Sequence, residues 1–223
     1  MERFNAEQFT DFLGKIGRLK SVPRHCVTPE GVQETVAAHC WRAAMMAWLM
    51  KDELGEIDID KVIHMCLLHD LGEAVTGDIP AFWKGEAHRQ VEREAVDRLL
   101  AALPPHLYEE AGALFAEMEA LETKEAKVYK ALDKLEAVIS HNESDIGTWL
   151  PLEYELQQTY AKKSVEGFPF LESLQELAVK RTREKIAQEE QRRKQNGAGG
   201  NEDRGSTTDA SATDGRKTEG NIR

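Results

Sequence analysis

His69 and Asp70 stand side by side at the end of an apolar run that begins at Val62. An imidazole and a carboxylate are costly to bury in apolar surroundings unless something offsets their lost hydration. A bound metal cation is the strongest such partner, because it takes an imidazole nitrogen and a carboxylate oxygen as ligands. The pair therefore indicates a metal site.

Two more polar residues on apolar faces could complete the ligand set. Apolar residues recur at helical spacing over residues 34–54, around His39, and over 128–139, around Asp133. Singly, an inward histidine is more often an ordinary core residue, and an aspartate before a lysine is more often solvated. Together with the adjacent pair, however, they offer two nitrogen and two oxygen ligands from three helices, which suits a divalent transition metal with coordination positions open to water and substrate.

A cation of this kind activates water and polarises a phosphoryl oxygen, as the hydrolysis of a phosphoester requires. The reaction also needs a positive group on the phosphate oxygens and a proton source for the leaving alkoxide. Arg24 fits the first need, since a guanidinium matches phosphate through paired hydrogen bonds, although an arginine after proline is more often a surface residue. Lys84 could add charge there, although a solvated lysine is more common.

The order His39, His69-Asp70, Asp133 resembles the HD-domain superfamily of metal-dependent phosphohydrolases. The resemblance extends from about residue 5 to residue 185 and is closer to the YfbR-like 5'-deoxynucleotidases within the superfamily. The segments that carry this closer resemblance are Arg18–Arg24, Val36–His39, Leu68–Pro80 and Lys130–Ala137.

The resemblance implies roles for residues near the pair. The substrate-phosphate arginine of the family falls on Arg24, and its catalytic acidic pair falls on Glu73 and Asp78. Glu73 lies three residues past Asp70, and Asp78 follows in the next loop, so both can reach the open side of the metal. The division of general acid and general base between them stays open.

One residue departs from the subfamily. Its characterised members place a tryptophan after the phosphate-binding arginine, a ring implicated in excluding the ribose 2'-hydroxyl, whereas this chain has His25. We expect His25 to lie at the substrate, but the preference for deoxyribose does not carry over with it.

The predicted activity is a metal-dependent 5'-nucleotidase acting on (deoxy)nucleoside 5'-monophosphates. One alternative is an HD phosphohydrolase of another nucleotide, such as a triphosphate, a cyclic dinucleotide or a guanosine alarmone. The other is a scaffold protein with a structural metal, which retention of both Glu73 and Asp78 disfavours. The divalent metal is Mn, Co, Fe or Zn, since all four accept these ligands. A homodimer is implied by the resemblance alone.

Helical periodicity fills nearly the whole chain, and no run of strand periodicity competes with it. Residues 73–83 contain Thr-Gly-Asp-Ile-Pro, which predicts a short loop or broken helix over the site. The fold class is therefore all-α, an HD-domain helical bundle with the metal between helices. The expected helices span 9–16, 34–54, 58–72 (with Asp58 or Asp60 as the N-cap), 86–103, 107–119, 125–141, 152–161 and 170–190.

Charge and composition restrict the possible partners and indicate how the chain divides into domains. The net charge of −11 argues against a duplex nucleic acid, whose backbone requires a basic face. No stretch approaches the roughly 20 apolar residues of a membrane span, and no signal peptide opens the chain, so we expect a cytoplasmic protein without membrane attachment. Residues 1–190 are predicted to form one domain and 191–223 a disordered polar tail. His141, at a helix end, is expected to be exposed or to cap the helix.

Overall fold

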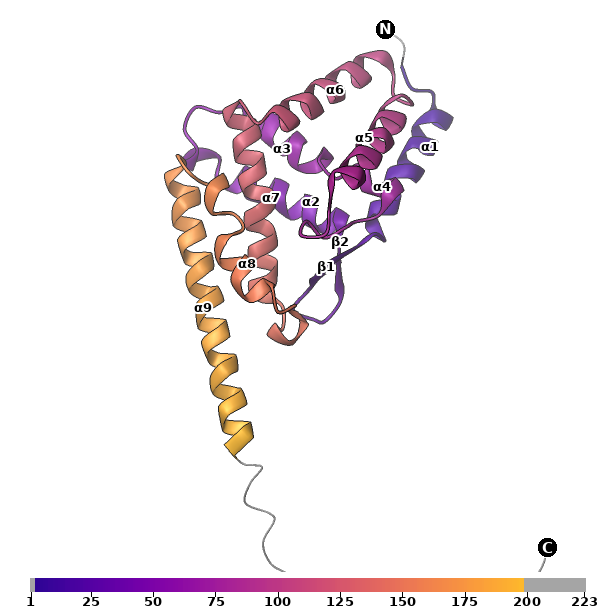
Figure 1. The fold of residues 1–223 in the computed structure, drawn as a ribbon. Helices are drawn as coiled ribbons and strands as arrows, with labels where there is room; N and C mark the ends of the chain where they lie inside the picture. Colours follow the sequence, from indigo (N-terminus) through magenta and orange to yellow (C-terminus); the bar gives the residue numbers. More distant parts are fainter. Residues whose placement is uncertain (1–2, 199–223) are drawn as a thin grey trace, which may run out of the picture. The chain divides into compact units, whose positions relative to one another are not determined.

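A computed structural model describes residues 3–198 of the 223-residue chain, and nearly all the ordered elements are helices (Figure 1). Two compact units are distinguished, Met1–Ala187 and Gln188–Arg223, and everything described below about the site belongs to the first. The elements, in order, are α1 (Ala6–Ile16), β1 (Pro23–Val27), β2 (Gln33–Thr35), α2 (Val36–Leu49), α3 (Ile59–Leu68), α4 (Glu73–Thr76), α5 (Glu86–Leu100), α6 (Pro105–Ala120), α7 (Lys124–Glu143), α8 (Glu153–Thr159) and α9 (Pro169–Ala198).

The core of the first unit lies among α2, α3 and α7, which pack on one another. Their apolar stripes meet in a cluster that includes the fully buried Met65, Leu132 and Leu135. Burying a side chain of this size stabilises the fold by about 1.5–3 kcal/mol. The predicted all-α class is confirmed, and the predicted ligands lie on α2 and α7 and directly after α3, the three helices at the centre of the core.

A small antiparallel hairpin was not expected from the sequence. β1 and β2 pair with Pro23 opposite Thr35 and Val27 opposite Gln33. The expectation that no strand competes with the helices is wrong here, because strands this short show no clear alternation of polar and apolar residues. A proline can begin such a strand because it has no N–H to contribute to the ladder. β1 contacts α7 and brings its residues to the site.

Of the two N-caps predicted for α3, the structure uses Asp58, and the helix ends earlier than expected. The Asp58 side chain accepts a hydrogen bond from the backbone N–H of Lys61 at 3.1 Å, the contact expected of an N-cap. The helix ends at Leu68, so His69 and Asp70 lie in the turn that follows it. α4 is a single turn that stops at Gly77, whose φ of 78° favours glycine.

The last helix is longer than predicted. It was expected to end near residue 190, but α9 continues to Ala198. Residues 191–195 read Gln-Arg-Arg-Lys-Gln, all good helix formers, and Glu189 pairs with Arg192 and Arg193 at 2.8 and 2.7 Å. Residues 199–223 of the predicted tail lie outside the described residues, and the boundary at 190 stays a prediction.

Within residues 3–198, no helix is both long enough and apolar enough to cross a lipid bilayer.

Candidate active site

The side chains of the four predicted metal ligands meet at one point. The Nε2 atoms of His39 and His69 are 3.3 Å apart, and Asp133 Oδ1 lies 3.3 Å from the first and 3.6 Å from the second. Asp70 Oδ2 is 3.2 Å from His69 Nε2. His39 comes from α2, His69 and Asp70 from the turn after α3, and Asp133 from α7. Packing of these core helices therefore assembles the group.

The outer nitrogen of each histidine is held by a hydrogen-bond acceptor. His39 Nδ1 donates to the buried carboxylate of Glu136, and His69 Nδ1 donates to the Cys66 carbonyl at 2.9 Å. With Nδ1 carrying the hydrogen, each neutral imidazole turns the lone pair of Nε2 inward. Partners of this kind commonly orient metal-binding histidines. The sequence reasoning missed Glu136, whose signal was a carboxylate three residues after Asp133 on the same helix face.

The electrostatics of the group call for a positive charge at its centre. Two lone-pair nitrogens and two carboxylates repel one another at these distances unless a cation lies between them. Burial alone would lower the pKa of His69, but Asp70 and other neighbours outweigh it and raise that pKa well above its usual value. Lys130 holds the outer oxygen of Asp133 at 2.8 Å and leaves Oδ1 to the site. The donor set therefore fits a divalent transition metal.

Arg24 reaches the same point from β1. Its Nη1 lies 3.6 Å from Asp70 Oδ2, and its Nε donates to Glu34 at 3.1 Å. Burial would lower the pKa of the guanidinium, but Asp70, Glu136 and Glu34 raise it further above its usual value. Arg24 is therefore a fixed positive charge beside the ligand group, held in place from its other edge.

Glu73 and Asp78 line the cavity near Asp70, with Lys84 among the acidic groups. Lys84 Nζ is 3.3 Å from Glu73 Oε1 and also pairs with Glu92. The second oxygen of Glu73 is buried without a hydrogen-bond partner among the described residues. Burial, then Asp70 and Asp78, raise the pKa of Glu73 to about 9, and burial chiefly raises that of Asp78. Lys84 thus offsets part of the negative charge of Glu73 and Glu92 as it lines the site.

A cavity of about 930 Å³ opens onto this group. That volume is at the upper end of the range for small-molecule sites. Phe82, from the loop after Asp78, supplies an aromatic ring to its wall and was not predicted. His39 is fully buried beneath the cavity, whereas the other predicted site residues line it: Arg24, His25, His69, Asp70, Glu73, Asp78, Lys84 and Asp133.

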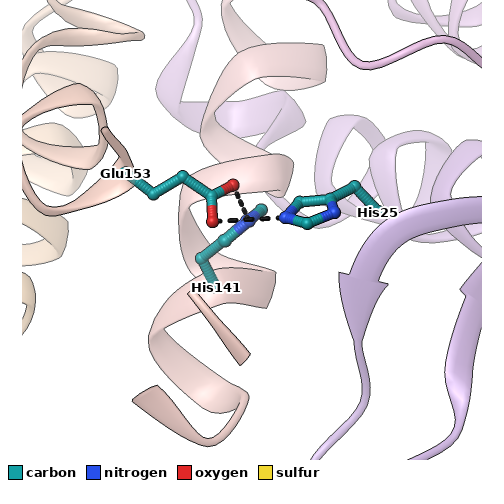
Figure 2. Close-up of side chains that lie close together, drawn as sticks. All are labelled: His25, His141 and Glu153. Carbon is teal, nitrogen blue, oxygen red and sulfur yellow. Dashed lines mark hydrogen bonds and ion pairs between the residues drawn. The ribbon is translucent and has the colours of Figure 1, made fainter. Parts of the chain in front are cut away.

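Two further residues on the cavity wall escaped the sequence reasoning. Figure 2 shows His25, His141 and Glu153 pointing toward one another. Glu153 Oε2 lies 3.2 Å from His25 Nε2, and Oε1 lies 2.9 Å from His141 Nε2. The expectation that His141 is exposed or caps the helix is wrong, because the side chain turns inward and is buried. No spacing in the sequence links the three, since they come from β1, α7 and α8.

The chain is similar to known proteins over most of its helical part. Residues 16–172 match the HD domain family. The chain is 36% identical to the human 5'-deoxynucleotidase HDDC2 over 143 residues, which cover 62% of this chain and 69% of the human protein. It is 31% identical to the 5'-deoxynucleotidase hdd1 of Schizosaccharomyces pombe, over 57% of this chain and 67% of the yeast protein.

One solved structure shares the fold closely. It is described as a predicted metal-dependent phosphohydrolase from Magnetospirillum magnetotacticum, and the TM-score is 0.71 at 29% sequence identity. The similarity covers 80% of this chain and 93% of that one.

Proposed function

We propose that this chain, which belongs to the HD domain family, is a metal-dependent 5'-nucleotidase that hydrolyses (deoxy)nucleoside 5'-monophosphates to nucleoside and phosphate. The observation that carries the proposal is the convergence of two imidazoles and two carboxylates beside a fixed guanidinium, at the base of one cavity. The relatives are named 5'-deoxynucleotidases, and these names direct the proposal toward nucleotides and include the deoxy forms.

The metal would be held by His39, His69, Asp70 and Asp133, with Mn, Fe, Co and Zn all compatible with two nitrogen and two oxygen donors. When bound, a divalent ion at this point supplies Lewis-acid activation of water and of the phosphoryl group. Glu136 and the Cys66 carbonyl keep both imidazoles in the tautomer that this binding requires.

Arg24 would bind the phosphate of the substrate. Its Nε is occupied by Glu34 and its Nη1 faces Asp70, so the guanidinium is oriented before substrate arrives. A positive group fixed in this way stabilises the charge that grows on the phosphate oxygens, without reorganising during the reaction. Lys84 would raise the local positive potential, while it restrains Glu73.

Glu73 and Asp78 would move the protons. Hydrolysis of the ester forms a bond from a water oxygen to phosphorus and breaks the bond from phosphorus to the 5'-oxygen. The water loses a proton and the leaving 5'-oxygen gains one, so a carboxylate and a carboxylic acid are both useful at the site. We assign these transfers to the pair jointly, because burial raises the pKa of each.

A phosphate-release screen tests the proposal. Purified protein is loaded in turn with Mn, Fe, Co or Zn and offered nucleoside mono-, di- and triphosphates and a cyclic dinucleotide. We expect phosphate release from monophosphates, abolished in Asp133→Ala, which lacks one of four ligands. Release from another class alone would favour an HD phosphohydrolase of that nucleotide. No release from any nucleotide, with metal bound, would favour a scaffold with a structural metal.

A cytoplasmic location and a homodimer belong to the same proposal and rest on the sequence and the family resemblance. The nucleotide substrate is the partner for which the cavity and the relatives offer support.

A further inference from the structure

The carboxylate of Glu153 organises the group drawn in Figure 2. The side chain is 1% exposed, and its two oxygens contact His25, His141 and the backbone N–H of Leu150, the last at 2.7 Å. Burial would raise the pKa of Glu153, but the His141 and Leu150 hydrogen bonds outweigh it and lower that pKa. An ionised carboxylate only accepts hydrogen bonds, so the Nε2 of each histidine must carry a hydrogen.

His141 carries a hydrogen on its other nitrogen as well. Its Nδ1 lies 2.8 Å from the Ala137 carbonyl, which can only accept. Both nitrogens therefore donate, and His141 is an imidazolium that neutralises Glu153. Burial would lower the pKa of His141, but the side chains of Cys26 and Glu153 outweigh it and raise that pKa to about 10.

The hydrogen bond to Glu153 makes the other ring nitrogen of His25, Nδ1, a hydrogen-bond acceptor. The Nε2 hydrogen is committed to Glu153, so in the neutral imidazole Nδ1 holds a lone pair. No described residue bonds Nδ1, and Figure 2 shows this nitrogen turned away from the carboxylate. The ring packs edge to face on Phe82, with centroids 6.0 Å apart, and borders the cavity.

We propose that His25 Nδ1 accepts a hydrogen bond from a ribose hydroxyl of the substrate, and that Glu153 and His141 are positioning residues that fix its proton. The inference rests on the proposed function, in which the preceding residue, Arg24, binds the phosphate. Arg24 and His25 are consecutive residues of β1 and both line the cavity, so His25 is placed to meet the group attached to the phosphate, which is the sugar. A sugar hydroxyl can donate the hydrogen that Nδ1 lacks.

His25 is half-buried in the free protein, and a bound nucleotide would cover its Nδ1 and shield it from water. A substrate without the hydroxyl leaves Nδ1 unpaired inside the cavity, which costs about 1–3 kcal/mol, or roughly tenfold or more in kcat/KM. The ring itself stays in place, because Glu153 and Phe82 hold it. The selectivity therefore comes from a hydrogen bond and not from a steric clash, and it favours the substrate that has the hydroxyl.

The test compares adenosine, 2'-deoxyadenosine and 3'-deoxyadenosine 5'-monophosphates as substrates of the metal-loaded protein. We expect one of the two deoxy compounds to fall at least about tenfold in kcat/KM in the wild type. His25→Phe keeps a ring but removes the acceptor, and should bring that ratio near one. In Glu153→Gln the new amide can donate a hydrogen bond to His25 Nε2, which would then carry the lone pair while the proton moves to Nδ1. Because Nδ1 would no longer be an acceptor, this substitution should also reduce the ratio. Glu155→Gln, an exposed change on the same helix, is the matched control and should keep it.

Four results would overturn the inference. In the first, the wild type hydrolyses all three substrates equally. In the second, His25→Phe and Glu153→Gln lower all three rates alike, which is the behaviour of a structural group. In the third, a second equivalent of transition metal is bound and lost in Glu153→Gln, since a metal at this group needs Nε2 lone pairs in place of hydrogens. In the fourth, the wild type releases no phosphate from any monophosphate, and then the proposed function fails together with this inference.

Discussion

Glu136 holds His39 from behind the metal group, in a hydrogen bond between two side chains that are both fully buried. The carboxylate also accepts from Arg42 Nε at 2.7 Å and from Ser140 at 3.1 Å, so its own position is fixed. The orientation of His39 is therefore a property of the core between α2 and α7, and it does not depend on the loops around the cavity.

We predict that Glu136→Gln weakens metal binding by about 10- to 100-fold, because the amide cannot hold the His39 tautomer as the carboxylate does. Competition with a chromophoric chelator measures the affinity. Glu143→Gln is the control, since Glu143 also accepts from Arg42 but is exposed and distant from the imidazole. Equal affinity in Glu136→Gln and the wild type would show that Glu136 serves only to neutralise Arg42.

Glu73→Gln should separate chemistry from metal binding. The substitution keeps the shape of the side chain and removes its ability to exchange a proton, so turnover should fall by roughly 10² to 10⁴. Metal content should stay at the wild-type level, because Glu73 lies outside the four-residue ligand group. Phosphate release and metal analysis of one preparation give both values, with the exposed Glu94→Gln as control. Near-normal turnover would remove Glu73 from proton transfer.

The sequence was sufficient to predict those site residues that are unusual within their own segment. His39, His69 and Asp133 are polar residues beside apolar helical stripes, and the structure brings their ligand atoms together. The helices themselves follow from periodicity and caps, as with Asp58 at the start of α3. Secondary structure and ligand positions of this kind depend on neighbours within a few residues, which a single sequence displays.

What the sequence could not predict depends on partners brought together by the fold. Glu153 is an ordinary acidic residue at the start of a short helix, and only tertiary packing makes it a buried anion beside two histidines. The hairpin β1–β2 likewise forms because its two strands meet each other, in segments too short for a periodic signal. Glu136 looks like a surface charge until its partner on α2 is known.

Arg24→Lys should lower kcat/KM by about 10² or more while leaving metal content unchanged. Lysine keeps the positive charge but loses the guanidinium that bonds Glu34 and faces Asp70. The positive charge is then no longer fixed beside the phosphate oxygens, where negative charge develops during the reaction. Steady-state kinetics with a nucleoside monophosphate measure the effect, and both KM and kcat should change. Arg18→Ala, an exposed change preceding the hairpin, is the control. Kinetics like those of the wild type would exclude Arg24 from phosphate binding.

The last prediction concerns the pH dependence of stability that His141 confers. Burial disfavours the imidazolium, but the side chains of Cys26 and Glu153 and the Ala137 carbonyl outweigh it and raise the pKa of His141 from 6.5 to about 10. The ring of His25 also faces His141, with centroids 6.1 Å apart. Between these two pKa values the unfolded chain has released a proton that the folded protein keeps. The stabilisation is therefore complete below pH 6.5 and is lost as the pH rises toward 10, by up to about 1.4 kcal/mol per pH unit for one proton.

The free energy of unfolding in urea, measured for the wild type and His141→Gln at several pH values from 6 to 10, isolates this contribution. The difference between the two proteins should be largest at pH 6 and shrink steadily above pH 6.5. His64→Gln, at an exposed histidine on α3, serves as the control. A difference that stays constant from pH 7 to pH 10 would mean that His141 is neutral in the folded protein. The hydrogen on its Nε2 could then no longer be assigned, and Glu153 would have to find its positive partner elsewhere.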